Sequence, residues 1–570
     1  MPTSVQGLIS SRLDRLDGAD KHLAHHAAVV GAIFWAGAVG HLGAQDAQSP
    51  DPRPGLETLE QRDFVHHNDA STIAGEDEYA FKHILMRDVA YGQIPKGRRA
   101  ELHVRFSDWV ELLPESADEF VELLAWHLEQ ACRLSREVAR SPIEPPLLEA
   151  ANALSQAARR AERREGLHEA ERYYTRALDV LGDAHPDVQL DLRLRRADIM
   201  MMVGGLKEAS DELEEVAEAA PGLYRKDVEC EALLLLGDID QRQGRLSDAH
   251  DRLVEAQRLA SATANAYLQV KVAFVLATFA ADNEGQHDDA VESLRAAVAT
   301  AQQIDDKALI AEGQLRIAAL LMSRDLAAAE PDLRRCLEIA SDLGSHRIEA
   351  EATSWLGIVA YYRGEPAEGE RLCLQARTWF ERTGDTYFQV QNIMRGLAIF
   401  ALADGRPEEA EAWLLEAVPI ALQIGGWVVV ETYRYLVEAL VAQDRLDDAR
   451  ELVVFAARNL PEEAADARAS LLMAEAITAT AAAESATASA SFAEALRLFE
   501  ELNLPLDLGE ARMALARSLR AFGDVTGAQT ELQRARTIFV RVGATTRRDA
   551  IDRELEDLVE GPAPTGPSTV

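Results

Sequence analysis

The sequence predicts an all-α protein: a right-handed superhelix of about ten stacked helix pairs, preceded by a small domain of different architecture. Three observations support this fold class. Strong helix formers (Ala, Leu, Glu and Arg) recur along the chain, whereas aromatic residues make up only 6%. A small residue returns about every 40 residues between positions 143 and 545, which is typical of a repeat architecture. Residues 1–113 lack this repeat.

The repeated small residue opens the second helix of each predicted pair. Its spacing stays between 39 and 41 residues, a register that a random Ala-rich helix would not keep. A small side chain at this point lets the second helix press against the first, and apolar residues four and seven positions later share its face. Because no pair can bury its apolar faces alone, neighbouring pairs must stack. The positions are Ala170, Ala209, Ala249, Ala290, Ala329, Gly369, Ala410, Ala449, Ala488 and Ala528.

The frame of each pair resembles the tetratricopeptide repeat. In one pair it comprises Gly237, a turn at Gly244, and then Ala249, Leu253 and Ala256. The period near 40 departs from the 34 residues of that family. The resemblance implies a non-catalytic scaffold for protein–protein interaction, in which the first helix of each pair lines a concave face.

Polar and aromatic residues recur at the inward offsets of these first helices. They predict a groove that binds a protein or an extended peptide, and an ordinary solvated groove is the alternative. The candidate partner-binding residues are Gln241, Gln314, Tyr361, Asn392, Arg395, Arg434 and Glu438.

Residues 1–113 predict a winged-helix-like domain. One or two helices are expected over residues 21–42, a loop over 43–55 and a short helix over 56–65. Turn residues between two extended runs within residues 66–86 predict a two-stranded wing. We expect a connecting helix within 114–142, the superhelix over 143–545, and a last helix with a disordered Pro- and Gly-rich tail over 546–570.

The segments SVQGLISSRLDRL, AAVVGAIFW and YAFKHILMRDVAYGQIPKGRRAELH resemble the region after the nucleotide-binding domain of bacterial STAND-class ATPases. Members of that class are often fused to class III nucleotide cyclases or transcription activators. The resemblance implies a partner P-loop ATPase or cyclase domain, since this sequence holds no GxxxxGK[ST] motif. It also implies that His83 contacts a nucleotide phosphate when an ATPase domain acts in trans; the alternative is a capping or core histidine.

Charge and motifs argue against several other functions. The net charge of −37 disfavours binding to nucleic acid or to an anionic membrane surface. The predicted recognition helix carries Glu57, Glu60 and Asp63 against Arg62 alone. No GxSxG elbow indicates an enzyme, and no cofactor is expected.

Metal and disulfide sites are not expected either. His22, His25 and His26 have helical spacing, but no second group of ligands accompanies them, so an amphipathic helix surface is the preferred interpretation. The four cysteines are far apart, which favours a reducing cytoplasm.

Three functional hypotheses follow. The first is a non-catalytic interaction scaffold or sensor module of a bacterial signalling regulator. The second is the C-terminal part of a STAND ATPase or nucleotide cyclase whose catalytic domains lie on a longer chain or on a partner. The third is a transcriptional regulator, which the acidic recognition helix disfavours.

Overall fold

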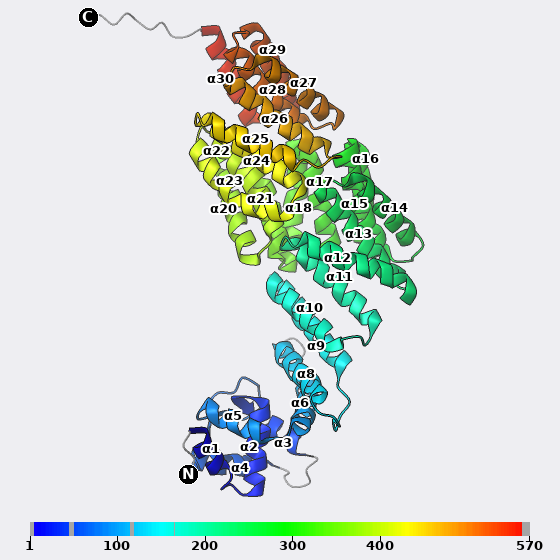
Figure 1. The fold of residues 1–570 in the computed structure, drawn as a ribbon, viewed down its shortest axis with the longest axis vertical. Coiled ribbons are helices and arrows are strands. Elements are labelled where there is room, and N and C mark those ends of the chain that lie inside the picture. The colour runs from blue at the N-terminus through cyan, green and yellow to red at the C-terminus, as the bar shows by residue number, and fades with distance from the viewer. Residues whose placement is uncertain (1–4, 45–50, 114–118, 165, 561–570) are drawn as a thin grey trace, which may run out of the picture. The chain divides into compact units, whose positions relative to one another are not determined.

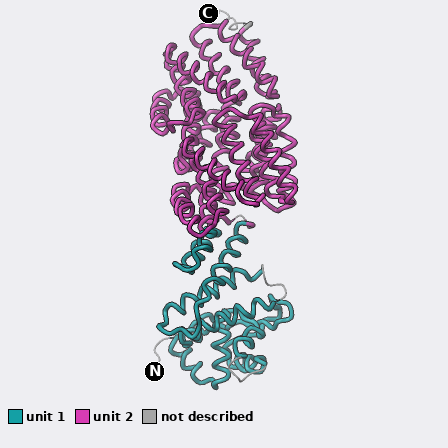
Figure 2. Tube along the Cα trace, turned by 90° about the vertical axis from the view of Figure 1, so that its right-hand side faces the viewer, with its two compact units in different colours: residues 1–162, 169–192 teal, residues 163–168, 193–570 magenta. Residues whose placement is uncertain are grey.

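The computed structural model describes residues 5–44, 51–113, 119–164 and 166–560. Within them the chain forms two compact units. Unit 1 comprises residues 1–162 and 169–192, and unit 2 comprises residues 163–168 and 193–570 (Figure 2).

Unit 1 begins with helices packed on a small antiparallel sheet (Figure 1). The strand order is β1-β3-β2, with Phe34 opposite Tyr79 and His66 opposite Ala80. Its elements are α1 (Val5–Leu13), α2 (Gly18–Val30), β1 (Ile33–Trp35), α3 (Ala36–Gly43), α4 (Arg53–Gln61), β2 (Val65–His67), β3 (Glu78–Phe81), α5 (Ile84–Gln93) and α6 (Lys96–Glu111).

The strand β1 lies where the sequence predicted helix throughout. After Gly31, the bulky residues Ile33, Phe34 and Trp35 favour extended backbone, and β3 provides the partner edge. Phe34 is fully buried and stacks on Tyr79. The predicted loop over 43–55 is shorter than expected, because α4 already begins at Arg53; residues 45–50 lie outside the described part of the chain.

Three further helices complete unit 1. The predicted connecting helix corresponds to α8 (Val121–Arg136), while residues 114–118 of that segment are not among those described. The first helix pair, α9 (Leu147–Arg163) and α10 (Leu167–Leu181), falls largely in unit 1.

Unit 2 is the repeat superhelix, and the all-α fold class is confirmed; the three short strands of unit 1 are the exception to it within the described residues. Successive first and second helices are α11 (Pro186–Met202) and α12 (Leu206–Ala219) with the short 3₁₀ helix η1 (Ala220–Leu223), α13 (Lys226–Gln243) and α14 (Leu246–Ser261), α15 (Ala266–Glu284) and α16 (His287–Gln303), α17 (Lys307–Met322) and α18 (Leu326–Leu343), and α19 (His346–Tyr362) and α20 (Pro366–Thr383). They continue with α21 (Thr386–Asn392), the π-helix η2 (Ile393–Ala398) and α22 (Ile399–Ala403) before α23 (Pro407–Ile424), then α24 (Gly426–Ala442) and α25 (Leu446–Arg458), α26 (Ala465–Ala481) and α27 (Ser485–Glu501), α28 (Pro505–Ala521) and α29 (Val525–Val542), and α30 (Thr545–Glu560).

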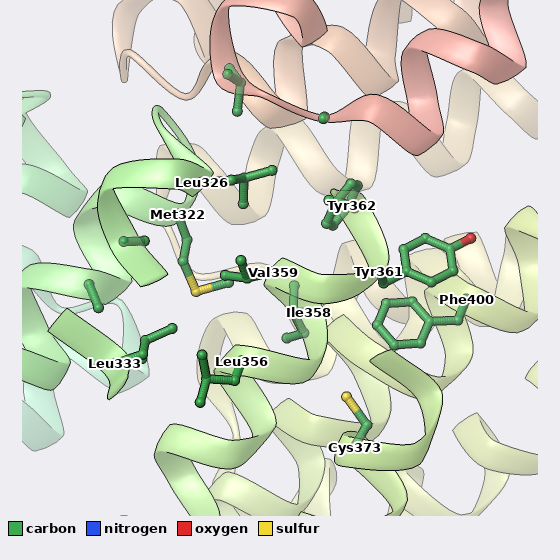
Figure 3. Close-up of a cluster of buried hydrophobic side chains, with 14 of the residues drawn as sticks. Met322, Leu326, Leu333, Leu356, Ile358, Val359, Tyr361, Tyr362, Cys373 and Phe400 are labelled. Atoms are coloured by element: carbon green, nitrogen blue, oxygen red, sulfur yellow. The ribbon is translucent and has the colours of Figure 1, made fainter. Parts of the chain in front are cut away.

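The predicted small residue is buried in every pair, at most 3% exposed where alanine occupies the position. The closest approach is at Gly369, where an added Cβ would lie 2.7 Å from the carbonyl oxygen of Gly357. Around this contact a core forms in which Tyr361 stacks on Phe400 with ring centroids 3.9 Å apart (Figure 3). The ~40-residue repeat therefore marks the tight contact within each helix pair.

Successive turns of the superhelix contact one another. Polar contacts join residues 183 to 220 positions apart, so one turn contains about five helix pairs. Each joins the end of a first helix, the turn after it or the start of the second helix to the following turn of the superhelix. They include Thr386 Oγ1 to the carbonyl oxygen of Met202 (3.3 Å), the amide of Ser247 to Glu463 (2.8 Å) and the amide of Leu506 to the carbonyl oxygen of Ser323 (3.2 Å).

All four cysteines are buried and free. Among the described residues, no helix is both long and apolar enough to cross a membrane.

Candidate binding cavity

The superhelix of unit 2 encloses a cavity of about 680 Å³. Its wall consists mainly of first helices, namely α11, α13, α15, α17, α19, α21, α24, α26 and α28, as expected for the concave face of a repeat array. Because successive turns touch, first helices of both turns contribute to the cavity wall. The volume lies within the roughly 300–1,000 Å³ of known ligand pockets.

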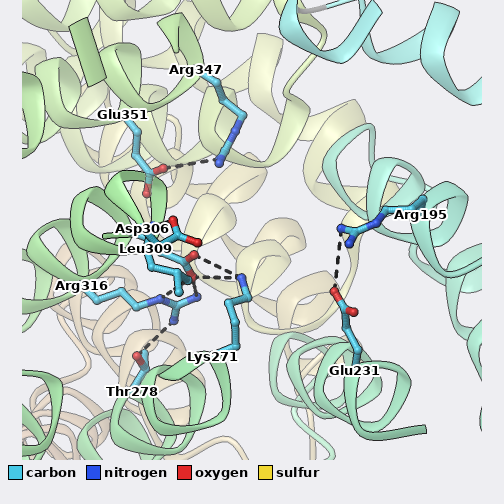
Figure 4. A network of polar contacts seen from close by, with 10 residues as sticks. Arg195, Glu231, Lys271, Thr278, Asp306, Leu309, Arg316, Arg347 and Glu351 are labelled. Carbon is cyan, nitrogen blue, oxygen red and sulfur yellow. Dashed lines mark hydrogen bonds and ion pairs between the residues drawn. The ribbon is translucent and has the colours of Figure 1, made fainter. Parts of the chain in front are cut away.

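The wall carries many charges, and most of them are paired. Eleven Asp and Glu side chains and seven Lys and Arg side chains line the cavity. Figure 4 shows Arg347 directed at Glu351, and Arg316 and Lys271 converging on one carboxylate. The pairs and their shortest N–O distances are Arg242 with Asp238 (2.6 Å), Lys271 with Glu312 (3.1 Å), Arg316 with Glu312 (3.0 Å), Arg347 with Glu351 (3.8 Å), Arg395 with Glu431 (3.0 Å), Arg434 with Glu438 (3.2 Å) and Arg547 with Glu510 (2.5 Å).

The carboxyl groups of the wall differ in their pKa values. Burial raises the pKa of Glu312, but Lys271 and Arg316 outweigh burial and lower it to about 2. By contrast, burial and the neighbouring Asp466 raise the pKa of Asp282 to about 7. Burial likewise raises the pKa of Asp507 to about 6, although Arg434 opposes this. The cavity thus holds buried carboxyl groups that the basic side chains of the wall do not fully keep in the ionised form.

Another part of the wall whose carboxyl groups are incompletely balanced lies where α19 faces the start of α21. Burial raises the pKa of Glu351 to about 8; Arg347 opposes this rise and Asp385 adds to it. Asp385 is 1% exposed: its Oδ1 caps α21 by accepting from the amide of Phe388 (3.2 Å), and its Oδ2 has no partner within the described protein. Gln391 is 7% exposed, and its Nε2 also has no partner among the described residues.

A side niche of about 10 Å³ opens beside Glu351 and Gln391, enough for roughly one water molecule. Trp355 and Phe388 belong to both the niche and the main cavity. Two carboxylates, one guanidinium, an amide and two aromatic rings therefore meet at this place, which we call the α19–α21 corner (Arg347, Glu351, Trp355, Asp385, Phe388 and Gln391).

Four of the seven residues predicted for the concave face line the cavity: Gln241, Arg395, Arg434 and Glu438. Gln241 donates to Asp282 (3.3 Å), and Arg395 lies over the ring of Trp427. At the other three positions the adjacent residue lines the wall instead. Leu315 does so next to Gln314, Tyr362 next to Tyr361, and Gln391 next to Asn392.

Two of these displacements have a clear physical cause. Tyr361 turns away from the cavity because its ring fills the core against Phe400. Asn392 precedes the π-helix η2, whose wider turn shifts the register of the preceding residues by about one position. Its side chain is consequently buried between helices and donates to Ser354 Oγ (2.8 Å).

Sequence reasoning missed Arg347 and Glu351, although a signal for them existed. They lie 22 and 18 positions before Gly369, on the same helical stripe as the predicted offsets of 18, 15, 11 and 8. The offset of 18 is also that of the predicted Asn392 before Ala410. Asp385 and Gln391 had no comparable signal, because the π-helix breaks the register between them and Ala410.

His83, the predicted nucleotide sensor, is an N-cap residue. Its Nδ1 accepts from the amide of Leu85 (3.1 Å) at the start of α5, and the side chain is exposed. The capping alternative therefore describes its local geometry. Of the histidines in α2, His25 contacts Gln93 (3.3 Å). The described residues contain no group of three or more His, Cys, Asp or Glu side chains placed to hold a metal ion.

Comparison with known proteins gives limited matches. A model of the tetratricopeptide repeat family matches residues 349–423. No curated protein sequence gives a significant match.

Solved structures with similar chains include several repeat proteins. A STAND protein with a tetratricopeptide repeat sensor from Pyrococcus horikoshii is 14% identical with a TM-score of 0.45; the alignment covers 78% of this chain and 63% of that one. A Rap protein complexed with competence and sporulation factor is 16% identical with a TM-score of 0.44, covering 72% and 100%. The quorum sensor NprR of B. thuringiensis is 11% identical with a TM-score of 0.38, covering 62% and 99%.

Proposed function

We propose that this protein is a non-catalytic sensor or scaffold that binds a short peptide, or an extended segment of a protein, in the cavity of unit 2. The observation that carries the proposal is the cavity itself, which nine first helices of the repeat array line with donors, acceptors and aromatic rings. A peptide backbone presents N–H and C=O groups along its whole length. Side chains such as Gln241, Thr278, Asn283 and Ser470 match both kinds of group.

Occupancy of the cavity also provides a means of signalling. A ligand that contacts both turns of the superhelix favours the arrangement in which these turns touch, because it gains contacts only there. The superhelix would thereby pass ligand binding to whatever protein contacts its outer face. In a bacterial signalling regulator, that protein is the effector.

The test is retention of peptides by the whole protein. A degenerate pentapeptide pool is incubated with the protein, the complex is isolated by gel filtration, and bound peptides are identified by mass spectrometry. Ala319→Trp places an indole in the cavity and should abolish retention, whereas Ala367→Trp on an exposed part of α20 should not. Thermal unfolding of both variants checks that they are folded. No retention by the wild type, or equal retention by Ala319→Trp, would refute the proposal.

We also propose that residues 5–113 form a winged-helix-like domain that contacts a P-loop ATPase or cyclase domain, on a longer chain or on a separate cytoplasmic protein. The β1-β3-β2 sheet with α2, α3 and α4 around it supports this interpretation. The mass of the complex isolated from the native host tests it: a species of only 62.5 kDa without a nucleotide-binding partner would contradict it.

A further inference from the structure

We propose that the cavity selects peptides with a basic side chain, and that this side chain occupies the α19–α21 corner. The inference rests on the proposed peptide-binding function and adds the charge of the ligand and the place of its recognition.

The first step is the charge of the corner. The guanidinium of Arg347 lies 3.8 Å from Glu351. Arg347 and Arg242 both act electrostatically on Asp385, and neither forms an ion pair with it within 4 Å. Asp385 lies close enough to Glu351 and Arg347 to affect both electrostatically. Across the whole cavity, Asp and Glu side chains outnumber basic side chains by eleven to seven. Burial favours the protonated form of several of these carboxyl groups, Glu351 among them. An incoming cation stabilises their ionised form, whereas an incoming anion opposes ionisation.

The second step is the unfilled hydrogen-bonding capacity of the corner. Asp385 Oδ2 accepts no hydrogen bond from the described protein, and Gln391 Nε2 donates none to it, although both atoms are buried. Buried polar atoms without partners are rare and costly. A ligand that enters the corner can supply a donor to Asp385 and an acceptor to Gln391.

A basic peptide has both groups. The ammonium or guanidinium of a Lys or Arg side chain donates to Asp385 Oδ2, and a backbone carbonyl oxygen accepts from Gln391 Nε2. A free polyamine has the cation but no carbonyl oxygen, so it satisfies only one of the two atoms. The rings of Trp355 and Phe388 add faces against which a cation is stabilised.

The test compares two pentapeptide pools that differ in one group. One pool has Arg at the central position; the other has citrulline, which is of nearly the same shape and uncharged. We expect the Arg pool to bind about 10- to 100-fold more tightly, the usual effect of a charged hydrogen bond. Affinities are measured by fluorescence anisotropy with labelled pools.

Variants of the protein locate the effect. Asp385→Asn keeps an oxygen to cap α21, and Glu351→Gln keeps the volume of the side chain; each should remove most of the preference for Arg over citrulline. The matched controls are Asp447→Asn and Glu368→Gln, whose carboxylates lie on the outer helices α25 and α20 away from the cavity. Both controls should retain the full preference.

The outcomes separate this inference from the proposed function. Equal binding of both pools overturns the basic-ligand inference and leaves peptide binding intact. A preference for Arg that survives in both Asp385→Asn and Glu351→Gln overturns the assigned place. If spermidine binds and neither peptide pool does, the cavity takes a polyamine, and both proposals fail.

Discussion

At the scale of single residues, unit 1 contains a buried histidine pair whose surroundings disfavour protonation. His103 and His127 are fully buried, and their Nδ1 atoms are 2.9 Å apart, so one must donate and the other accept. Tyr91 Oη lies 2.8 Å from the remaining ring nitrogen of His103. Protonation of both rings would bring two N–H groups face to face.

This pair predicts that unit 1 loses stability in mild acid. Burial, with the nearby Arg87, lowers the pKa of His103 to about 3, from 6.5 in an unfolded chain. Below about pH 6.5, His103 therefore binds a proton in the unfolded state. In the folded state it stays unprotonated down to about pH 3. Stability should fall by about 1.4 kcal/mol per pH unit for each such histidine.

Urea unfolding at pH 7.5, 6.5 and 5.5 measures this loss. His103→Gln should flatten the pH dependence, whereas His66→Gln, at an exposed position of β2, should preserve it. The same slope in both variants would show that another group causes the loss of stability.

At the scale of elements, α19 and α20 form the tightest backbone contact within a helix pair that any glycine of the described repeats makes. A Cβ at Gly369 would meet not only the carbonyl oxygen of Gly357 but also the backbone nitrogen of Tyr361 at 2.9 Å. Backbone atoms of a helix cannot move aside as the end of a side chain can. Glycine at this one repeat therefore allows a closer approach than the alanine of the other repeats.

Gly369→Ala should accordingly destabilise unit 2 by about 1–3 kcal/mol, the usual cost of overpacking. The free energy of unfolding in urea measures this cost. Gly222→Ala provides the comparison, because a Cβ there meets nothing within 4 Å, and its effect should stay within about 0.5 kcal/mol. A neutral Gly369→Ala would mean that the two helices can separate without penalty.

The elements also show how far the sequence could predict this structure. The repeat frame was predictable because every helix pair needs a small side chain where its two helices touch. Small residues therefore recur in the sequence at a constant spacing. The strand Ile33–Trp35 was not, since its three residues pair with β3 more than 40 positions away. The π-helix was not predictable either, and this is why Asn392 was chosen for the wall and Gln391 was missed.

At the scale of the whole repeat array of unit 2, contacts between turns close the cavity. The tightest involves Gly426 at the start of α24, where a Cβ would lie 2.0 Å from the carbonyl oxygen of Arg242 at the end of α13. Its φ of 62° is also unfavourable for residues with a side chain. Gly405 has a comparable φ of 72°, but nothing lies within 4 Å of its Cβ position.

These two glycines separate backbone strain from contact between turns. Gly426→Ala and Gly405→Ala should both lose about 1–2 kcal/mol from the left-handed backbone. Only Gly426→Ala should also loosen the end of α13, which hydrogen exchange of the amides from Gln241 to Gly244 would detect as faster exchange. Equal exchange in both variants would show that the contact between turns does not hold the cavity closed.

The contact between turns also limits how the length of this array can change over evolution. In an open repeat array each unit touches only its neighbours, so one unit can be gained or lost with local consequences. Here Met202 meets Thr386, and Ser323 meets Leu506, because a fixed number of helix pairs separates them. Loss of one internal helix pair would shift one turn against the next, so the residues that now contact each other across the lost pair would no longer face each other. The two sides of the cavity wall would be displaced in the same way. We therefore expect the number of helix pairs in the superhelix to stay constant over evolution, despite its repetitive sequence.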